Sequence, residues 1–302
     1  GKPGANLEAK LAETDQTYGP TESFPFRSRI VPAQRSERSL RIWIASASHA
    51  HDSRVPANTI FPSQLGEKLE SRGIANEILN ASLPGNSLSD NEAELALRGP
   101  TWKPDVVLIY QMSTDLVGST RDVPTGAPGT PRGLGAQLVD AMDALAERTT
   151  IFELLKSNVS SRITAASVLD RQLPDGAEKQ YFESLNRLIE RARSLGARPI
   201  VCTFCFSHAP SRLPGDYQLV LLKTAPTLDP VAWFDSITAW NKTLLSHPDL
   251  EVIDVAEGTS GEGEFFRDPV HFSVKGHEHV ANRLAEYFEL NVAQTAGSGD
   301  RE

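Results

Sequence analysis

Cysteine is scarce in this chain of 302 residues, which has only Cys202 and Cys205. Two cysteines cannot build a disulfide framework. Their Cys-x-x-Cys spacing also occurs in redox motifs and in half of a zinc site. Here, however, the pair lies in the apolar run 199–206, which is typical of a buried strand, where side chains three positions apart point to opposite faces. We therefore expect two buried thiols and no metal site.

The chain also lacks long hydrophobic runs and an excess of positive charge. No apolar run approaches the ~18 residues of a membrane span, and no signal peptide is visible. A formal net charge of −9 argues against nucleic acids and anionic membranes as partners. The start Gly1-Lys2-Pro3-Gly4 and the polar region after it fit an exported or membrane-anchored domain whose signal or anchor was removed, whereas reduced cysteines permit the cytoplasm. Compartment and oligomeric state stay open.

Short apolar runs alternate with longer helical patterns, and the 39% hydrophobic and 23% charged residues are typical of globular proteins. The runs predicted to be strands are residues 40–45, 77–81, 105–110, 198–206 and 251–255. Helical spacing occurs in residues 61–72, 89–97, 134–148, 151–156, 177–195, 230–245 and 273–290. Strands that alternate with helices predict an α/β fold, a three-layer α/β/α sandwich around a mainly parallel five-stranded sheet.

A single domain covers most of the chain. Residues 1–38 are expected to form an N-terminal arm, residues 39–291 the domain and residues 292–302 a flexible tail. Residues 117–133 and 207–228 interrupt the alternating pattern and are expected to be long loops. Both follow the C-terminal ends of predicted strands, where open parallel sheets bind their ligands, and loops of this length are often functional lids.

The most informative stretch is R-D-P-V-H-F-S, residues 267–273. It places Asp268 three residues before His271, ahead of the last predicted helix. One short loop then carries a base and the acid that orients it. Taken alone, such a pair is more often an ordinary capped loop.

A candidate nucleophile follows the first predicted strand. Ser48 lies where that strand breaks into a loop, with Ser46 and Ser53 as neighbours that are easily confused with it. A serine at a strand end is common and by itself means little. Together with an aspartate and a histidine far downstream, Ser48 completes a nucleophile, acid and base in the chain order Ser, Asp, His.

Polar residues also follow the second and third predicted strands. The turn at residues 80–87 contains Gly85, which permits a positive φ or the close backbone approach that an oxyanion-binding amide requires. The third strand runs into Gln111 and then Met112-Ser113-Thr114-Asp115. The alternative is that these residues are ordinary turn and helix-capping residues.

These four segments, in this order, resemble the SGNH hydrolases, the superfamily of GDSL-type esterases and lipases, over roughly residues 38–290. The nucleophilic serine of that family falls on Ser48, its second-block glycine on Gly85, its Gly-x-Asn-Asp block on residues 112–115, and its Asp-x-x-His pair on Asp268 and His271. Two departures stand out: Ser46-Ala47 replaces the usual Gly-Asp, and Thr114 replaces the asparagine whose amide donates to the oxyanion. The Gly-x-Ser-x-Gly elbow of an α/β-hydrolase does not occur.

The resemblance implies a flavodoxin-like fold and a serine esterase that forms an acyl-enzyme without a cofactor or metal. His271 would be the base, Asp268 its orienting acid, and Ser48, Gly85 and Thr114 the oxyanion hole, with Asn86 or Gln111 as substitute donors. The expected substrate is a small ester, an acetyl group on a carbohydrate first. The alternatives are an acyltransferase with the same triad and a glycan-binding protein with impaired catalysis. Residues expected to line the substrate site are His49, Asn86, Gln111, Asp115 and His208.

Overall fold

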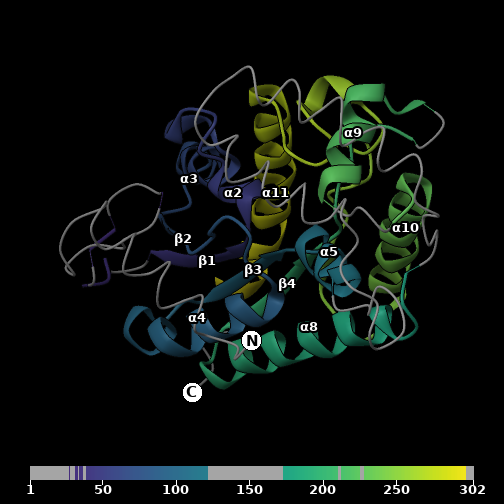
Figure 1. Ribbon diagram of the computed structural model, residues 1–302. Helices are drawn as coiled ribbons and strands as arrows, with labels where there is room; N and C mark the ends of the chain where they lie inside the picture. The colour runs from purple at the N-terminus through teal and green to yellow at the C-terminus, as the bar shows by residue number, and fades with distance from the viewer. Residues whose placement is uncertain are drawn as a thin grey trace, which may run out of the picture.

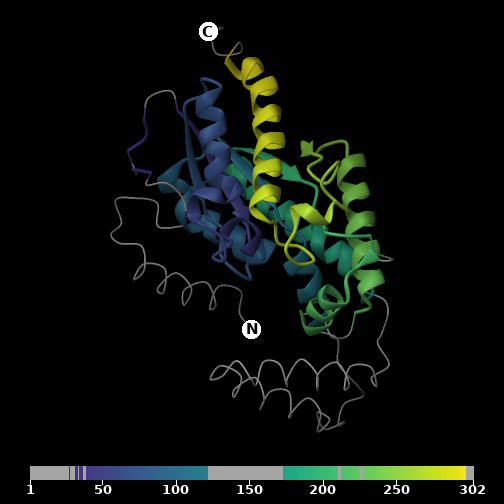
Figure 2. The ribbon, with the colours of Figure 1, turned by 90° about the horizontal axis from the view of Figure 1, so that it is seen from above.

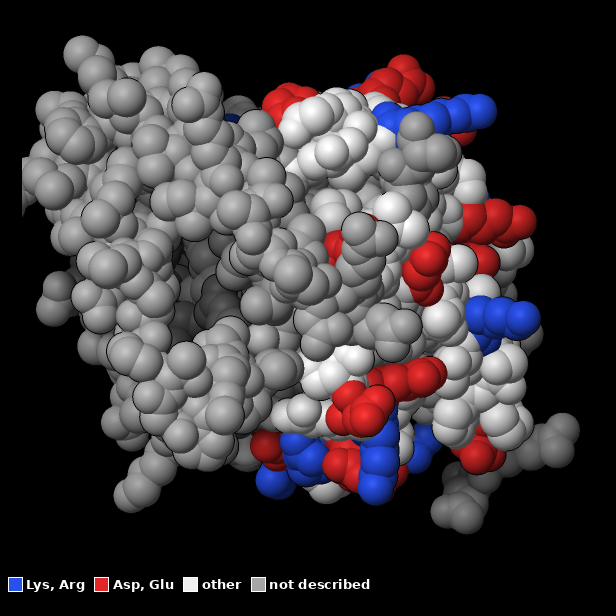
Figure 3. Space-filling view, turned by 45° about the vertical axis from the view of Figure 1, so that its right-hand side comes forward, with Lys and Arg blue, Asp and Glu red and all other residues white. Residues whose placement is uncertain are grey.

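The computed structural model describes residue 27 and residues 31–32, 34–36, 39–121, 173–209, 212–224 and 228–296. The helices predicted at residues 134–148 and 151–156 lie outside the described residues, as do most of the predicted arm and the end of the tail. None of the described helices is long and apolar enough to cross a membrane. On the face shown in Figure 3, acidic and basic side chains are interspersed over the described part of the surface.

A five-stranded, fully parallel sheet forms the centre of the molecule, with strand order β2-β1-β3-β4-β5. This order is that of the flavodoxin-like fold, and it confirms the prediction from the sequence. The central strands have near-continuous apolar sequences, as strands covered on both faces do. The strands are β1 (Leu40–Ser46), β2 (Asn76–Asn80), β3 (Val106–Tyr110), β4 (Arg198–Cys202) and β5 (Val252–Ile253).

Helices cover both faces of the sheet, so the predicted three-layer sandwich is confirmed (Figure 1). The helices α3 (Phe61–Ser71) and α11 (Val274–Ala296) lie side by side on one face (Figure 2), and α4 (Leu88–Trp102) and α8 (Ala177–Ser194) pack together on the other. The remaining elements are the helices α2 (Ser48–His51), α5 (Ser113–Arg121), α9 (Gly215–Thr224) and α10 (Pro230–Ser246), and the 3-10 turns η1 (Ala57–Thr59) and η3 (Gly263–Phe265).

The strand predicted at residues 198–206 is shorter than expected. β4 ends at Cys202 because the backbone of Phe204 binds the side chain of Asn241 on α10 in place of a neighbouring strand. Asn241 donates to the Phe204 carbonyl and accepts from its N–H, both at 2.8 Å. The expectation that both cysteines lie on one strand is therefore wrong. Both thiols are nevertheless buried and free, as predicted.

The two predicted long loops contain helices. Residues 117–121 of the first stretch belong to α5, whereas residues 122–133 lie outside the described residues, and α9 lies within residues 207–228. Neither segment has a strong apolar periodicity, because α5 is mostly small and polar and α9 mixes polar residues with a short aliphatic run. Their helical state depends on packing against the rest of the molecule. Both helices contribute to the cavity described below.

Candidate active site

The four segments singled out in the sequence come together at one edge of the sheet, beyond the C-terminal ends of β1, β2 and β3. β1 ends at Ser46, which pairs with Tyr110 of β3 and donates its hydroxyl to the Tyr110 carbonyl at 2.5 Å. Ser48, two residues later, is the first residue of α2. The sheet therefore fixes the position of Ser48, and α2 turns the chain away directly behind it.

Ser48, His271 and Asp268 form a chain of hydrogen bonds. The hydroxyl of Ser48 lies 2.8 Å from Nε2 of His271. Nδ1 of the same ring lies 2.9 Å and 2.8 Å from the two oxygens of Asp268. A carboxylate accepts the Nδ1 proton, which leaves the lone pair of Nε2 facing the Ser48 hydroxyl. The structure thus brings together the three residues that the sequence proposed for catalysis.

The Asp268 carboxylate is held from several sides. Its Oδ1 accepts the backbone N–H groups of Val270 at 3.0 Å and His271 at 2.8 Å, and Arg54 donates to its Oδ2 at 3.0 Å. Burial alone would raise the pKa of this carboxyl, but the hydrogen bonds and charge of His271, with the two backbone donors, outweigh it and hold the pKa well below its ordinary value. Asp268 is therefore a fixed anion beneath the imidazole.

The three residues predicted to form the oxyanion hole line the same cavity as the triad: Ser48, Gly85 and Thr114. Ser48 begins a helix, where the first backbone N–H groups have no partner within the helix. Gly85 has a φ of +75°, a conformation that favours glycine. Thr114 is the second residue of α5. Thr114 thus lines the cavity at the position where the resemblance implied the longer amide of an asparagine.

His49 lies against the base. Its ring stacks on that of His271, with the centroids 5.2 Å apart and the planes 17° from parallel. Its Nε2 lies 3.0 Å from the hydroxyl of Ser113, and Phe204 packs edge-on at 4.9 Å. The side chain is 1% exposed, and burial, followed by the charge of His271, lowers its pKa well below the ordinary value. His49 is thus a neutral ring that packs directly on the imidazole of His271.

Three of the residues expected to line the substrate site lie behind it instead. Gln111 donates to the backbone carbonyl of Asn86 at 2.9 Å and to Asp115 at 2.8 Å, and Asp115 accepts the N–H of Leu88 at the start of α4 at 2.9 Å. Burial raises the pKa of Asp115 to about 6. These side chains join α4 to α5, and none of the three is among the residues that line the cavity beside Ser48. The capping alternative describes them better.

His208 is also absent from that lining. Its ring packs edge-on against Tyr217 of α9, with centroids 5.7 Å apart. On another side it lies so close to Gly263 that an added Cβ there would come within 2.3 Å of Nε2. His208 therefore joins α9 to the turn η3, and the expectation that it reaches the substrate is not supported by its position.

Sequence reasoning missed a charged cluster behind the triad. Asp52, only 2% exposed, is ion-paired with Arg267 and accepts from Nε2 of His277 at 3.2 Å. Hydrogen bonds to His277 and Arg267 overcome the effect of burial and lower the pKa of Asp52 to about 2. Arg54 links this cluster to Asp268. The feature of the sequence that could have indicated this cluster is the presence of charged residues close to Ser48 and Asp268.

The cavity beside Ser48 has a volume of about 260 Å³. Its remaining wall is apolar and comes from three helices and the loop before His271. The residues of this wall are Val117 of α5, Val220 and Leu221 of α9, Trp233 of α10, and Pro269 and Val270. The sequence did not predict this wall.

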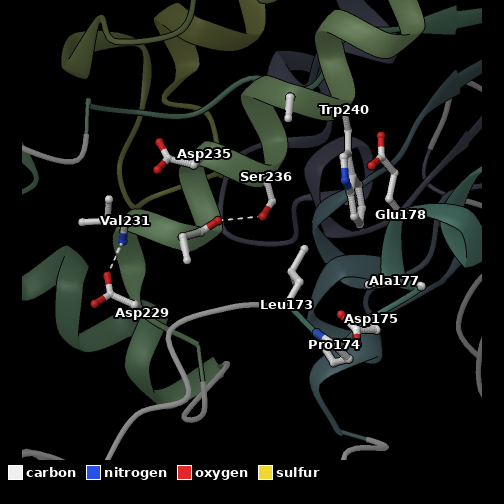
Figure 4. A pocket seen from close by; sticks show the side chains of 13 residues that line it. Leu173, Pro174, Asp175, Ala177, Glu178, Asp229, Val231, Asp235, Ser236 and Trp240 are labelled. Atoms are coloured by element: carbon white, nitrogen blue, oxygen red, sulfur yellow. Dashed lines mark hydrogen bonds between the residues drawn. The ribbon is translucent and has the colours of Figure 1, made fainter.

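A larger hollow of about 790 Å³ lies between the start of α8 and α10, away from the triad (Figure 4). Carboxylates are prominent in its lining, but Asp229 accepts the N–H of Val231 at 2.7 Å as a cap of α10. Ser236 likewise donates to a carbonyl within α10. The hollow contains none of the predicted site residues, and no group of side chains suited to a metal ion occurs in the described part of the chain.

The sequence matches no protein-family model and no curated protein. Solved structures with a similar fold include a GDSL-like lipase from Bacteroides thetaiotaomicron, at 10% identity and a TM-score of 0.49, with 95% of this chain and 98% of that chain covered. A catalytic mutant of an acetylxylan esterase from Geobacillus stearothermophilus is 14% identical, with a TM-score of 0.49 and coverage of 84% and 95%. A lipase/acylhydrolase from Enterococcus faecalis is 16% identical, with a TM-score of 0.45 and coverage of 83% and 96%.

Such low identities carry no information on the substrate, which has to come from the cavity. The flavodoxin-like strand order, and the order in which the four site segments follow the strands, agree with the fold implied by the resemblance to the SGNH hydrolases, the superfamily of GDSL-type esterases and lipases.

Proposed function

We propose that this protein is a serine hydrolase that cleaves a carboxylic ester through an acyl-enzyme on Ser48. The observation that carries the proposal is the continuous hydrogen-bond chain from Ser48 through His271 to Asp268, at 2.8 to 2.9 Å, at the wall of a cavity. A nucleophile, a base and a buried orienting carboxylate in mutual contact are the minimum for this chemistry.

In the first half-reaction, Oγ of Ser48 attacks the ester carbonyl carbon while Nε2 of His271 takes its proton. The carbonyl electron pair moves onto the oxygen, which the Ser48 and Gly85 amides and the Thr114 hydroxyl stabilise. Collapse of this intermediate breaks the bond to the alcohol, which leaves with the proton from His271. Water then attacks the acyl-enzyme by the same route, releasing the acid and restoring Ser48.

The acyl group and the alcohol are separate questions. The acetylated carbohydrate and the acyltransferase alternative, both taken from the resemblance, stay predictions. The glycan-binding alternative draws on the Ser46-Ala47 and Thr114 departures. Against it stands the intact contact between Ser48 and His271, which a protein that only binds glycans has no need to keep.

The proposal is tested with p-nitrophenyl butyrate and a fluorophosphonate probe on the wild type and Ser48→Ala. We expect turnover and covalent labelling in the wild type and the loss of both in the variant, with the label on the Ser48 peptide by mass spectrometry. Ser53→Ala, at an exposed neighbouring serine, is the matched control and should behave as wild type. Equal turnover in Ser48→Ala would refute the assignment, and a wild type with neither activity would favour the binding alternative.

A further inference from the structure

The cavity beside Ser48 has two chemically different parts, and their arrangement bears on the acyl group, given the ester hydrolysis proposed above. The part next to the nucleophile is polar and holds the triad, Ser113 and Thr114. The other part is apolar and is walled by Val117, Leu221 and Trp233, which are 7%, 6% and 2% exposed. An ester bound here has its carbonyl in the polar part and a neighbouring apolar wall for one of its two substituents.

The helix α5 connects the two parts. Thr114 and Val117 lie three residues apart on this helix, so they share one face and follow one another along its axis. A carbonyl oxygen at Thr114 therefore places the adjoining carbon chain alongside Val117, with Leu221 of α9 and Trp233 of α10 completing the wall. We propose that this apolar part binds the acyl chain and selects a chain of about six to eight carbons.

The volume of the cavity limits the length of the acyl chain that it can hold. At about 30 Å³ for each water molecule in the liquid, the cavity of about 260 Å³ has the volume of about nine waters, and a methylene group takes a similar space. The ester group itself occupies part of this volume, which leaves room for a hexanoyl to octanoyl chain. An acetyl group would fill only a small share of the cavity and would leave the cavity-facing surfaces of Leu221 and Trp233 without an apolar contact from the substrate.

The strength of the selection follows from the transfer of methylene groups out of water. A buried methylene contributes about 0.8 kcal/mol, which corresponds to about a fourfold gain for each carbon added. We therefore expect kcat/KM to rise about two- to fourfold per carbon from the acetate ester to the hexanoate or octanoate, and to fall for longer chains that no longer fit.

The experiment is a series of p-nitrophenyl esters from acetate to dodecanoate, which share one leaving group, measured on the wild type, Val117→Phe and Val220→Phe. The first substitution adds a ring at the buried wall, and the second adds one at the half-exposed rim of α9, where Val220 is 40% exposed and folding is less sensitive. Leu245→Phe, at a 49% exposed position of α10 outside the cavity, is the matched control.

We expect kcat/KM of the wild type to be highest for acyl chains of about six to eight carbons. In whichever wall variant folds, this optimum should move to shorter chains, and in Leu245→Phe it should not move. An optimum at acetate, or an optimum that neither wall variant moves, would overturn the inference while leaving ester hydrolysis intact. Absence of turnover with every ester, together with no labelling of Ser48, would instead overturn the proposed function and this inference with it.

Discussion

Replacing His49 with leucine or with phenylalanine would separate two roles of its ring. One is to fill space, and the other is to present an aromatic face to the base, His271. In the structure the ring lies 5.2 Å from that of His271 and nearly parallel to it, with its edge held by Ser113 and Phe204. Burial lowers the pKa of His49 well below its ordinary value, so the ring is neutral at neutral pH. When the base takes the Ser48 proton, a neutral aromatic face then lies against a new cation.

A cation within about 6 Å of an aromatic ring gains about 0.5–1 kcal/mol at exposed sites and about 2 kcal/mol where water is excluded. His49 is 1% exposed, but the His271 side chain is 20% exposed, so the middle of this range applies. Both substitutions fill the site and remove the bond to Ser113, but only His49→Phe keeps an aromatic face. We expect His49→Leu to lower kcat about tenfold relative to His49→Phe, which equals about 1.4 kcal/mol, with little change in KM because the stabilisation arises only after proton transfer.

The assay is steady-state hydrolysis of p-nitrophenyl butyrate, with the rate of fluorophosphonate labelling as a second measure of Ser48 reactivity. Thermal unfolding of both variants serves as the control for folding. Equal kcat values in two folded variants would refute the reasoning, whether both are active or both inactive. A KM effect without a kcat effect would point to substrate contact instead of support for the base.

Other predictions rest on the neighbouring groups. Asp268→Asn should lower kcat by about 10⁴, because an amide cannot hold the imidazole in the reactive tautomer; a loss below tenfold in the butyrate assay would contradict the assigned role. Thr114→Asn should raise kcat at least about tenfold by supplying an amide donor to the oxyanion, and an unchanged rate would place Thr114 outside the oxyanion hole. Asp52 should stabilise the fold above pH 4 and lose that effect as the pH falls toward 2, because its pKa is lowered from 3.8 to about 2. In urea unfolding, the free energy of unfolding of the wild type should fall by about 2 kcal/mol through this effect as the pH is lowered, and Asp52→Asn should lack this part of the decrease. The same dependence of unfolding free energy on pH in both proteins would contradict the prediction.

Local patterns in the sequence predicted the features that short-range physics controls. The alternation of apolar runs and helical spacing determined a parallel sheet covered on both faces, because buried strands and amphipathic helices each carry their own periodicity. The Asp268 and His271 pair was equally local, since one turn of loop backbone supplies two of the hydrogen bonds that hold the carboxylate. The burial of both cysteines was predicted as well, although Cys205 lies beyond the end of its strand.

Contacts between distant segments were decided by the tertiary structure alone. Ser48 and His271 are 223 positions apart, and only the order of the strands brings them within 2.8 Å. The same packing turned Gln111 and Asp115 toward the start of α4 and away from the cavity, because a helix start needs acceptors for its N–H groups. It also joined three helices into the apolar wall. Spacing along a chain determines the type and direction of each element, but the partners of a side chain depend on how those elements pack.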